Sequence, residues 1–450
     1  MKPKIFKIIF SISIGTFLFA SNVVAQSSKQ TIKKETYIPT DIWKVPKENN
    51  YDDPNSEYSN LRKLESENIV VFWAKDYGDD PANYPDLTKR FDPHEIIAEC
   101  ERIYKLYVED LKFIEKGNSL TDKFKLLIYV FSEDDGTAYG GGAEEKVGVI
   151  WTPAVRINKK PYGAIAHEMG HCFQYLSKCD GNWAYSKPVS GSRGNSIFEM
   201  TSQYMLWQAY PNWIQFENYH LKAFLDKTHF AFMHETNMYH SPFVLEYWSS
   251  LHGIDFIGEM WRESLKDEDP VMTYKRLNNI SQQEFNRELF IGYQKLITFD
   301  FPRIQQISSP YANQSTTKMD TLAKNYYRIQ KSNCPQNYGY NAIPLKPTAK
   351  KVKLSFNGRT DLKEFNILNS ENAGWHYGFV AVSKSGERTY GNVNNKMKGN
   401  VSFDIPKETE YLWLVVMGAP NEHMPHLIDG KDVTDEQWPY EIKLKGAELL

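Results

Sequence analysis

The chain has 450 residues, of which 41% are hydrophobic and 24% are charged. This composition is close to that of an average globular protein, and it excludes a wholly disordered chain, a collagen-like fibre and a multi-span membrane protein. The formal net charge of −3 gives no basic excess that would indicate nucleic acid as a partner, and four cysteines are too few for a disulfide scaffold.

The first 25 residues have the composition of a secretory signal peptide. Three lysines within the first seven residues precede an apolar run from Ile8 to Ala20, and the small residues Val23 and Ala25 favour cleavage after Ala25. The apolar run is short for a membrane span, so an uncleaved anchor helix is the weaker alternative. We expect residues 1–25 to be removed and the protein to be exported to the periplasm, the cell surface or the exterior, with no membrane span after cleavage.

Composition divides the rest of the chain into four segments. Residues 26–64 are polar and are expected to form an arm or linker, and residues 65–305 combine a few short strands with a long, mostly helical, aromatic-rich stretch. Residues 306–343, rich in Ser, Asn, Gln and Thr, are expected to be a connector. Residues 344–450 hold short apolar runs separated by Gly, Asn and Pro, which is typical of a β-sandwich or jelly roll. The predicted fold class is α+β, a small mixed sheet with a mostly helical part followed by an all-β sandwich.

Hydrophobic periodicity places the elements of the 65–305 segment. The expected strands are Ile69–Trp73, Phe124–Phe131 and Val147–Thr152, and the expected helices are Pro93–Lys116 and two that begin near Tyr162 and Asn195. Three consecutive glycines, at positions 140–142, predict a flexible turn between the second and third strands.

The sequence His167-Glu168-Met169-Gly170-His171 lies on the helix expected near Tyr162. Two histidines four residues apart share one face of a helix, so both imidazoles can reach one Zn²⁺. The glutamate between them can take a proton from a metal-bound water. A stray histidine pair on an exposed helix is the alternative.

The rest of this helix disfavours the stray pair. One apolar stripe, which begins at Ile165 and continues every three or four residues, lies opposite the two histidines. The face with the histidines holds Gly163 and Gly170 rather than the Lys and Glu that are typical of a solvated face. These small residues predict that another element packs closely there and that the histidines are buried.

A third ligand is expected on the next helix. Glu199 follows a loop with Gly and Ser residues, which allows the chain to turn back toward the histidines. Two histidines and one glutamate, with a fourth position for water, are the ligands of an open catalytic zinc site. The alternative is a capping box, in which Ser196 is the N-cap residue and Glu199 only caps the helix.

On these residues the chain resembles zincin metallopeptidases of the gluzincin type, in which HExxH is followed by a glutamate on a downstream helix. The resemblance implies that His167, His171 and Glu199 bind Zn²⁺, that Glu168 is the general base, and that residues 65–305 are the metallopeptidase domain. The chain is also similar to uncharacterised secreted zincin-like proteins of gut-type Gram-negative bacteria, a similarity that includes the sandwich but supplies no substrate.

The resemblance has one further implication and two departures. In zinc peptidases a strand before the HExxH helix pairs with an extended substrate, and Gly148–Thr152 would be that strand here. Gluzincins often have Asn before the third ligand and an acid four residues after it, whereas this chain has Phe198 and Gln203. Gln203 can still accept a hydrogen bond from an imidazole, but as a neutral group it does so more weakly.

Other residues are weaker candidates. Attack by water needs a donor that stabilises the developing oxyanion, and Tyr239 or His240 is expected to supply it, with ordinary packing as the alternative. The tail has a candidate second metal cluster (Glu422, His423, His426, Asp429) and a candidate sugar platform (Trp375, Trp413, Trp438), although Trp413 is more typical of a core position.

The leading hypothesis is a secreted zinc-dependent metallohydrolase, expected to be a peptidase that cleaves protein or glycoprotein by Glu168-assisted attack of zinc-bound water. The sandwich would be an accessory domain that contacts substrate, glycan or a surface. Two alternatives stay open. One is a non-catalytic binding protein on a zincin scaffold, and the other is a carbohydrate-active enzyme in which HExxH is accidental and two carboxylates flank a sugar bond.

Overall fold

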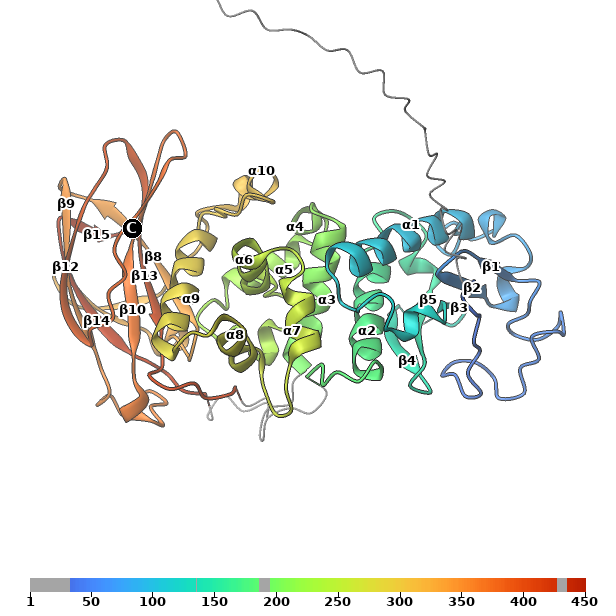
Figure 1. The fold of residues 1–450 in the computed structure, drawn as a ribbon. Helices are drawn as coiled ribbons and strands as arrows, with labels where there is room; N and C mark the ends of the chain where they lie inside the picture. Colours follow the sequence, from blue (N-terminus) through green and yellow to red (C-terminus); the bar gives the residue numbers. More distant parts are fainter. Residues whose placement is uncertain (1–32, 135, 186–194, 427–434) are drawn as a thin grey trace, which may run out of the picture. The chain divides into compact units, whose positions relative to one another are not determined.

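The computed structural model describes residues 33–134, 136–185, 195–426 and 435–450. The predicted signal peptide, residues 1–25, lies outside the described residues. Residues Lys34–Leu450 belong to one compact unit, which contains helices and three five-stranded sheets (Figure 1). Helices and strands occur together, and the C-terminal part is rich in antiparallel strands, so the α+β class is confirmed.

The first sheet has the strand order β1-β2-β3-β5-β4. Its strands are β1 (Lys63–Glu65), β2 (Ile69–Trp73), β3 (Leu126–Phe131), β4 (Tyr139–Ala143) and β5 (Val147–Pro153). The three central strands, β2, β3 and β5, are parallel and fully buried. Parallel strands covered on both faces read as continuous apolar runs, and this is why their positions could be predicted from the sequence.

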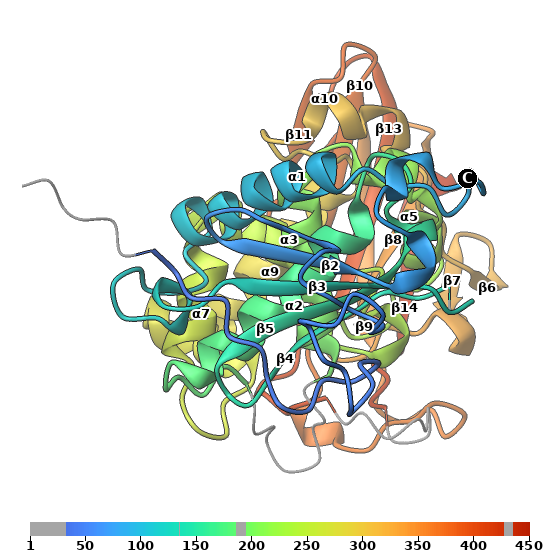
Figure 2. The ribbon, with the colours of Figure 1, turned by 90° about the vertical axis from the view of Figure 1, so that its right-hand side faces the viewer.

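Different parts of the chain cover the two faces of this sheet. Helices α1 (Pro93–Lys105) and α2 (Gly163–Cys179) pack on one face. Residues 34–62, which we call the arm, run over the other face, in front of the strands in Figure 2. Two tyrosines of the arm pack edge-on against rings of the sheet, with ring centroids 5.0 Å apart for Tyr58 and Tyr129 and 5.3 Å apart for Tyr51 and Phe72. The arm therefore contributes side chains to the core of this part.

The prediction of a flexible turn at residues 140–142 is wrong, because these glycines form the edge strand β4. A Cβ added to Gly140 would lie 2.1 Å from the Glu168 carbonyl oxygen of α2, and one added to Gly142 would lie 2.1 Å from the Tyr175 ring. The glycines thus let β4 lie directly against α2. Strand β5 is flanked by β3 and β4, so the expectation that Gly148–Thr152 pairs with substrate is also wrong.

The middle of the chain is helical, as the sequence predicted. The helices after α2 are α3 (Asn195–Ala209), α4 (Trp213–Phe216), α5 (Asn218–Leu225), α6 (Phe243–His252), α7 (Phe256–Glu263), α8 (Pro270–Asn278), α9 (Gln282–Leu296) and α10 (Gln305–Ser308). Helix α1 is shorter than the predicted Pro93–Lys116, because it continues as a π-helix over Leu106–Asp110 and then ends.

Two antiparallel sheets make up the C-terminal part. One has the order β11-β10-β13-β8-β15, with β8 (Tyr340–Pro347), β10 (Trp375–Ser383), β11 (Arg388–Tyr390), β13 (Thr409–Gly418) and β15 (Ala447–Leu449). The other has the order β12-β9-β14-β7-β6, with β6 (Met319–Ala323), β7 (Tyr326–Ile329), β9 (Lys351–Gly358), β12 (Lys398–Asp404) and β14 (Tyr440–Lys445). Buried side chains from both sheets form one core, so the two sheets are the layers of a sandwich.

Two expectations about this region need correction. Residues 306–343 are more than a connector, since they contain β6, β7 and the start of β8. Strand β6 is an exposed edge strand, where polar residues are tolerated, and this explains the loop-like composition. The expected sugar platform is wrong, because all three of its tryptophans are buried: Trp375, Trp413 and Trp438 are at most 3% exposed.

The sheet that contains β13 is buried on both faces. Leu412 and Leu414 face the sandwich core, whereas the alternate residues Trp413 and Val415 join the core of the helical part. Helix α9 packs against β10 and β13 from this second side. The helical part and the sandwich therefore share a continuous apolar core.

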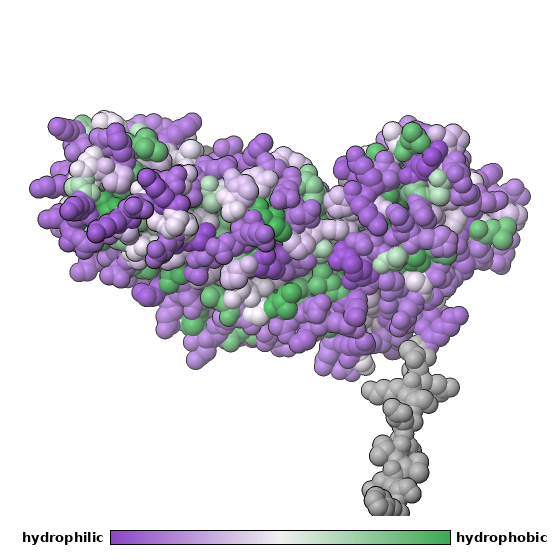
Figure 3. Space-filling view, turned by 90° about the horizontal axis from the view of Figure 1, so that it is seen from above, coloured by the Kyte–Doolittle hydropathy of each residue, from purple (hydrophilic) through white to green (hydrophobic). Residues whose placement is uncertain are grey.

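The face of the molecule seen in Figure 3 is largely hydrophilic, with hydrophobic residues in small scattered groups. Within the described ranges, no helix combines the length and the apolar character that a membrane crossing requires.

The β10–α9 contact predicts a pH dependence of stability. His376 on β10 is 3% exposed, and its Nδ1 has no hydrogen-bond partner among the residues that the structure describes. Burial, followed by the charge of Arg287, lowers its pKa to about 4. An unfolded histidine titrates near pH 6.5, so below that pH unfolding takes up a proton and acid destabilises the fold. This pKa shift corresponds to a loss of roughly 2 kcal/mol in the free energy of unfolding as the pH falls from neutral to about pH 5.

We expect His376→Phe to reduce this acid sensitivity by a comparable amount, measured as the change in unfolding free energy in denaturant titrations at both pH values. His94→Phe, at an exposed position of α1, is the matched control and should leave the pH dependence unchanged. An unaltered pH dependence in His376→Phe would show that His376 is protonated as easily in the fold as in the unfolded chain.

Candidate metal centre

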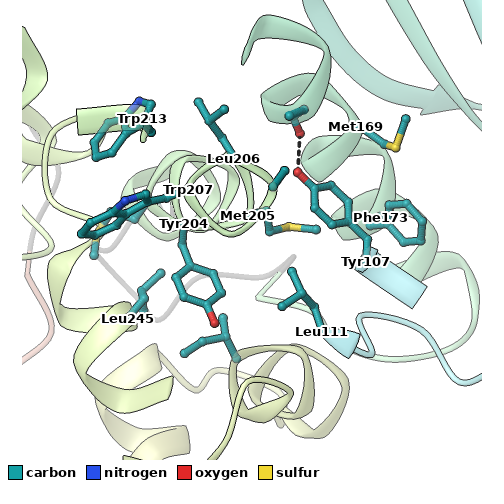
Figure 4. Packing of buried hydrophobic residues seen from close by; sticks show 14 of the residues in the cluster. Tyr107, Leu111, Met169, Phe173, Tyr204, Met205, Leu206, Trp207, Trp213 and Leu245 are labelled. Carbon is teal, nitrogen blue, oxygen red and sulfur yellow. Dashed lines mark hydrogen bonds between the residues drawn. The ribbon is translucent and has the colours of Figure 1, made fainter. Parts of the chain in front are cut away.

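Helix α2 presents two different faces, as its sequence predicted. Ile165, Met169 and Cys172 are at most 1% exposed and pack toward the sheet, where the Cys172 thiol donates a hydrogen bond to the Val149 carbonyl oxygen of β5 at 3.4 Å. Figure 4 shows the core beside this helix, in which the Tyr107 hydroxyl donates to the Ala166 carbonyl oxygen at 2.9 Å. This packing fixes the rotation of α2 about its axis and turns the two histidines away from the sheet.

Helix α3 is the element that packs against the histidine face. A Cβ added to Gly170 would lie only 2.8 Å from Ser202 Oγ and 3.2 Å from Ser202 Cα. Helices α2 and α3 can therefore approach this closely only because position 170 has no side chain. The prediction that another element packs against the glycines is confirmed, although the two histidines are half-buried rather than fully buried, with side chains 12% and 17% exposed. The contact brings Glu199 of α3 to the two histidines.

The three predicted ligands meet at one point. Glu199 Oε2 lies 3.1 Å from His167 Nε2 and 3.3 Å from His171 Nε2, and the two Nε2 atoms are 3.2 Å apart. A tetrahedral Zn²⁺ with bonds of about 2.0–2.1 Å separates its ligand atoms by about 3.3 Å. The three donor atoms thus have the spacing and the chemistry of a zinc site with three protein ligands.

The outer nitrogen of each imidazole contacts a neutral side chain. His167 Nδ1 lies 3.1 Å from Gln203 Oε1, and His171 Nδ1 lies 2.9 Å from Gln174 Oε1. An amide oxygen can only accept, so each Nδ1 is the donor and each Nε2 is left for a metal. Both orienting groups are amides, where a gluzincin often has an acid at the position of Gln203.

The capping alternative for Glu199 is not realised in the structure. The Ser196 hydroxyl is buried and has no hydrogen-bond partner in the described part of the chain, whereas the Glu199 carboxylate contacts both imidazoles. Burial raises the pKa of Glu199, but His167 and His171 lower it well below the usual range when their Nε2 atoms carry protons. The Glu199 carboxylate is thus directed at the Nε2 atoms, where a metal ion would take the place of those protons.

We call His167 Nε2, His171 Nε2 and Glu199 Oε2 the donor triangle, and Glu168 lies beside it. Ligand atoms of Glu168 and of the two histidines all fall within 4.8 Å of one another. Burial raises the pKa of the Glu168 carboxyl, although the two histidines and the Gly140 backbone act in the opposite direction. A carboxylate with a raised pKa next to a metal site is suited to accept and return a proton.

The structure separates the two candidates for the oxyanion donor. The Tyr239 ring stacks against that of His167 with the ring centroids 6.1 Å apart, and the charge of Glu199 acts on its hydroxyl. His240 instead lies 2.7 Å from His220, Nδ1 to Nδ1. Tyr239 therefore borders the donor triangle, whereas His240 is linked to it only through other side chains.

His220 also lies near the site, although its sequence context indicates only a surface or packing residue. His220 is 8% exposed and its Nε2 lies 3.1 Å from Gln203 Nε2. No spacing rule connects a histidine of α5 with a glutamine of α3, because the contact depends on the path of the intervening loop.

The tail residues do not assemble into the expected second cluster. His423 hydrogen-bonds to Asp269 at 2.7 Å, His426 to Glu235 at 3.1 Å, and Asp429 lies outside the described residues. His426 does come within 4.8 Å of His234 and Asp435, as a candidate metal group would. However, His234 Nδ1 accepts the Thr236 N–H at 3.0 Å, so its Nε2 carries the hydrogen that faces Asp435 at 3.2 Å. The contact between His234 and Asp435 is thus an ordinary hydrogen bond that needs no metal ion.

Comparison with known proteins places the chain in a family. Residues 28–450 match the model of DUF6055, a family of unknown function, so the chain belongs to this family. No curated protein is significantly similar in sequence.

Similar solved structures share little sequence with this chain. A Yersinia pseudotuberculosis-derived mitogen is 8% identical, with a TM-score of 0.18, and the match covers 29% of this chain and 86% of the mitogen. A glycosylation-associated protein complex from Streptococcus agalactiae is 15% identical, with a TM-score of 0.15 and coverage of 29% and 38%. A conserved protein of unknown function from Bacillus anthracis str. Ames, in a mutant form, is 10% identical, with a TM-score of 0.29 and coverage of 79% and 74%. These low TM-scores do not support a fold or function assignment.

The donor triangle predicts how the third ligand responds to substitution. Glu199→Gln keeps the shape of the side chain but removes the charge that Zn²⁺ favours. We expect zinc affinity to fall by more than about 10-fold, because even outer partners of metal ligands contribute that much. Competition with a chromophoric chelator measures the affinity. Ser196→Ala is the control, and its zinc affinity should equal that of the wild type. If Glu199→Gln also binds zinc as tightly as the wild type, Glu199 is not a ligand.

Proposed function

We propose that this DUF6055 protein is a zinc-dependent metallohydrolase of the gluzincin type that cleaves peptide bonds in protein or glycoprotein substrates. The observation that carries the proposal is the donor triangle of His167, His171 and Glu199, with sides of 3.1–3.3 Å. It combines the ligand types of a zinc hydrolase with a neighbouring carboxylate, Glu168, that is not needed as a ligand.

The residues around the triangle supply the remaining steps of a hydrolysis. A Zn²⁺ held there would polarise a substrate carbonyl and lower the pKa of a water. Glu168 is placed to take a proton from the attacking water and to pass it to the leaving amine. Burial, together with the charge of Glu199, raises the pKa of Tyr239 to about 12, so its hydroxyl keeps its proton at neutral pH and can donate to a developing oxyanion.

The edge strand favours a peptide as substrate. Strand β4 is the edge of the first sheet, is half-buried, and runs against α2 at Glu168. An extended peptide that pairs with this edge would place its backbone next to the general base, whereas a sugar chain has no backbone amides for such pairing. This strand replaces β5 as the proposed substrate-binding strand.

Two alternatives receive less support. The hypothesis of a carbohydrate-active enzyme loses one supporting observation, because the three tail tryptophans expected to form a sugar platform are buried. A non-catalytic binding protein would not need Glu168, which is present and next to the donor triangle. The basic and apolar start of the chain supports export, so proteins and mucin-like glycoproteins found outside the cytoplasm are the proposed substrate pool.

Glu168→Gln tests catalysis without disturbing the metal ligands. We expect this variant to bind zinc like the wild type but to lose nearly all hydrolysis, because an amide cannot accept the proton of water. The assay incubates wild type and variant with a mixed pool of proteins and mucin-like glycoproteins and identifies new peptide ends by mass spectrometry.

His167→Ala and chelator treatment are the controls for the metal. Both should abolish the new peptide ends, and added zinc should restore them only in the chelator-treated wild type. Normal zinc content with identical products in wild type and Glu168→Gln would favour the binding protein. Release of sugar that survives chelation would favour the carbohydrate-active enzyme, because carboxylate chemistry at a sugar needs no metal.

A further inference from the structure

Four side chains form a continuous line from the donor triangle into the helical part. His167 Nδ1 lies 3.1 Å from Gln203 Oε1, Gln203 Nε2 lies 3.1 Å from His220 Nε2, and His220 Nδ1 lies 2.7 Å from His240 Nδ1. Gln203 Nε2 also donates to the Tyr239 carbonyl oxygen at 2.9 Å. The line therefore connects α2, α3 and α5 with the loop that carries Tyr239 and His240.

The orientation of the Gln203 amide follows from its neighbours. The Tyr239 carbonyl oxygen can only accept a hydrogen bond, so the NH₂ end of the amide must face it. The oxygen end then faces His167, whose Nδ1 must carry a hydrogen, and this leaves His167 Nε2 for a metal. The second amide hydrogen is directed at His220.

The same hydrogen-bond argument determines which nitrogens of His220 and His240 carry a hydrogen. His220 Nε2 accepts from the Gln203 amide, so a neutral His220 carries its hydrogen on Nδ1 and donates it to His240 Nδ1. Burial, followed by the charges of His240 and His167, lowers the pKa of His220 to about 3, and burial also lowers the pKa of His240. Both imidazoles are thus neutral at physiological pH, as the pattern requires. A nearby carboxylate oxygen, Glu217 Oε2, is 3.7 Å from His220 Nε2 and is held at 2.6 Å by the Trp213 indole N–H.

We infer that His220 is a positioning residue for the metal centre, which acts through Gln203 to hold His167 in the tautomer that presents Nε2 to Zn²⁺. A carboxylate at position 203 would need no such help, because both of its oxygens accept. An amide has one accepting end and one donating end. If the Gln203 amide were rotated by half a turn, its N–H would point at His167 Nδ1, and His167 would then carry its hydrogen on Nε2, where it opposes metal binding. His220 stabilises the correct orientation by accepting the second amide hydrogen. This inference rests on the proposed zinc site and explains how a neutral glutamine can replace an acid there.

A double-mutant cycle on zinc affinity tests the inference. We expect His220→Phe to weaken zinc binding by about 10-fold in the native background, which is the low end of the effect of outer partners of metal ligands. In the Gln203→Glu background the same change should have almost no effect, because the carboxylate needs no orienting acceptor. A histidine that only fills space would cost the same affinity in both backgrounds. His229→Phe, at another buried histidine that is not part of this line, should leave zinc affinity unchanged.

Affinity is measured by chelator competition, and thermal unfolding in the presence of chelator checks that each variant folds. Should His220→Phe not fold, nitrogen-15 spectra of the histidines in the zinc-loaded wild type decide: the inference requires the Nδ1–H tautomer of His220, and the Nε2–H tautomer overturns it. If the wild type binds zinc and His220→Phe binds it equally tightly, the inference is wrong, but the proposed function is not affected. A wild type that binds no zinc overturns the proposed function, and this inference with it.

Discussion

The close contact between α2 and α3 at Gly170 is the constraint on which the donor triangle depends. A helix pair this close brings three side chains of α3 within reach of α2, because Glu199, Ser202 and Gln203 lie on one face at helical spacing. Glu199 meets both Nε2 atoms, Ser202 Oγ lies 3.2 Å from His171 Nδ1, and Gln203 lies beside His167 Nδ1. A side chain at position 170 would separate the helices and withdraw all three groups together.

Charge is concentrated in one ligand of the site. The partners of the two imidazoles are the amides Gln203 and Gln174, and the second amide is itself held by the Phe198 carbonyl oxygen and by Ser202. Neutral partners make the imidazoles weaker electron donors than carboxylate partners would. A divalent ion bound here would therefore keep more of its positive charge, which favours polarisation of a bound carbonyl over the tightest possible metal retention.

Residues close in sequence were easier to interpret than residues close only in space. The HExxH pair and the opposed apolar stripe follow from the helical period of 3.6, and the central strands follow from continuous apolar runs, which a single segment displays by itself. Strand β4 was missed because three glycines are typical of a turn. The structure needs these glycines because the backbone of α2 at Glu168 lies against the strand, and α2 belongs to another segment of the sequence. Strand β6 was missed because an exposed edge carries no apolar pattern. His220 was missed because its partner, Gln203, is brought to it by tertiary packing alone.

The sheet that is buried on both faces limits how the molecule can move. Any hinge between the helical part and the sandwich would expose Trp413, Val415 and their neighbours to water, at a cost that grows with every side chain uncovered. A clamshell motion of two lobes is thus disfavoured as the way for a substrate to enter. Access to the proposed metal centre would then depend on local movements of loops, and the sandwich, which shares buried side chains with the helical part, is not a detachable module.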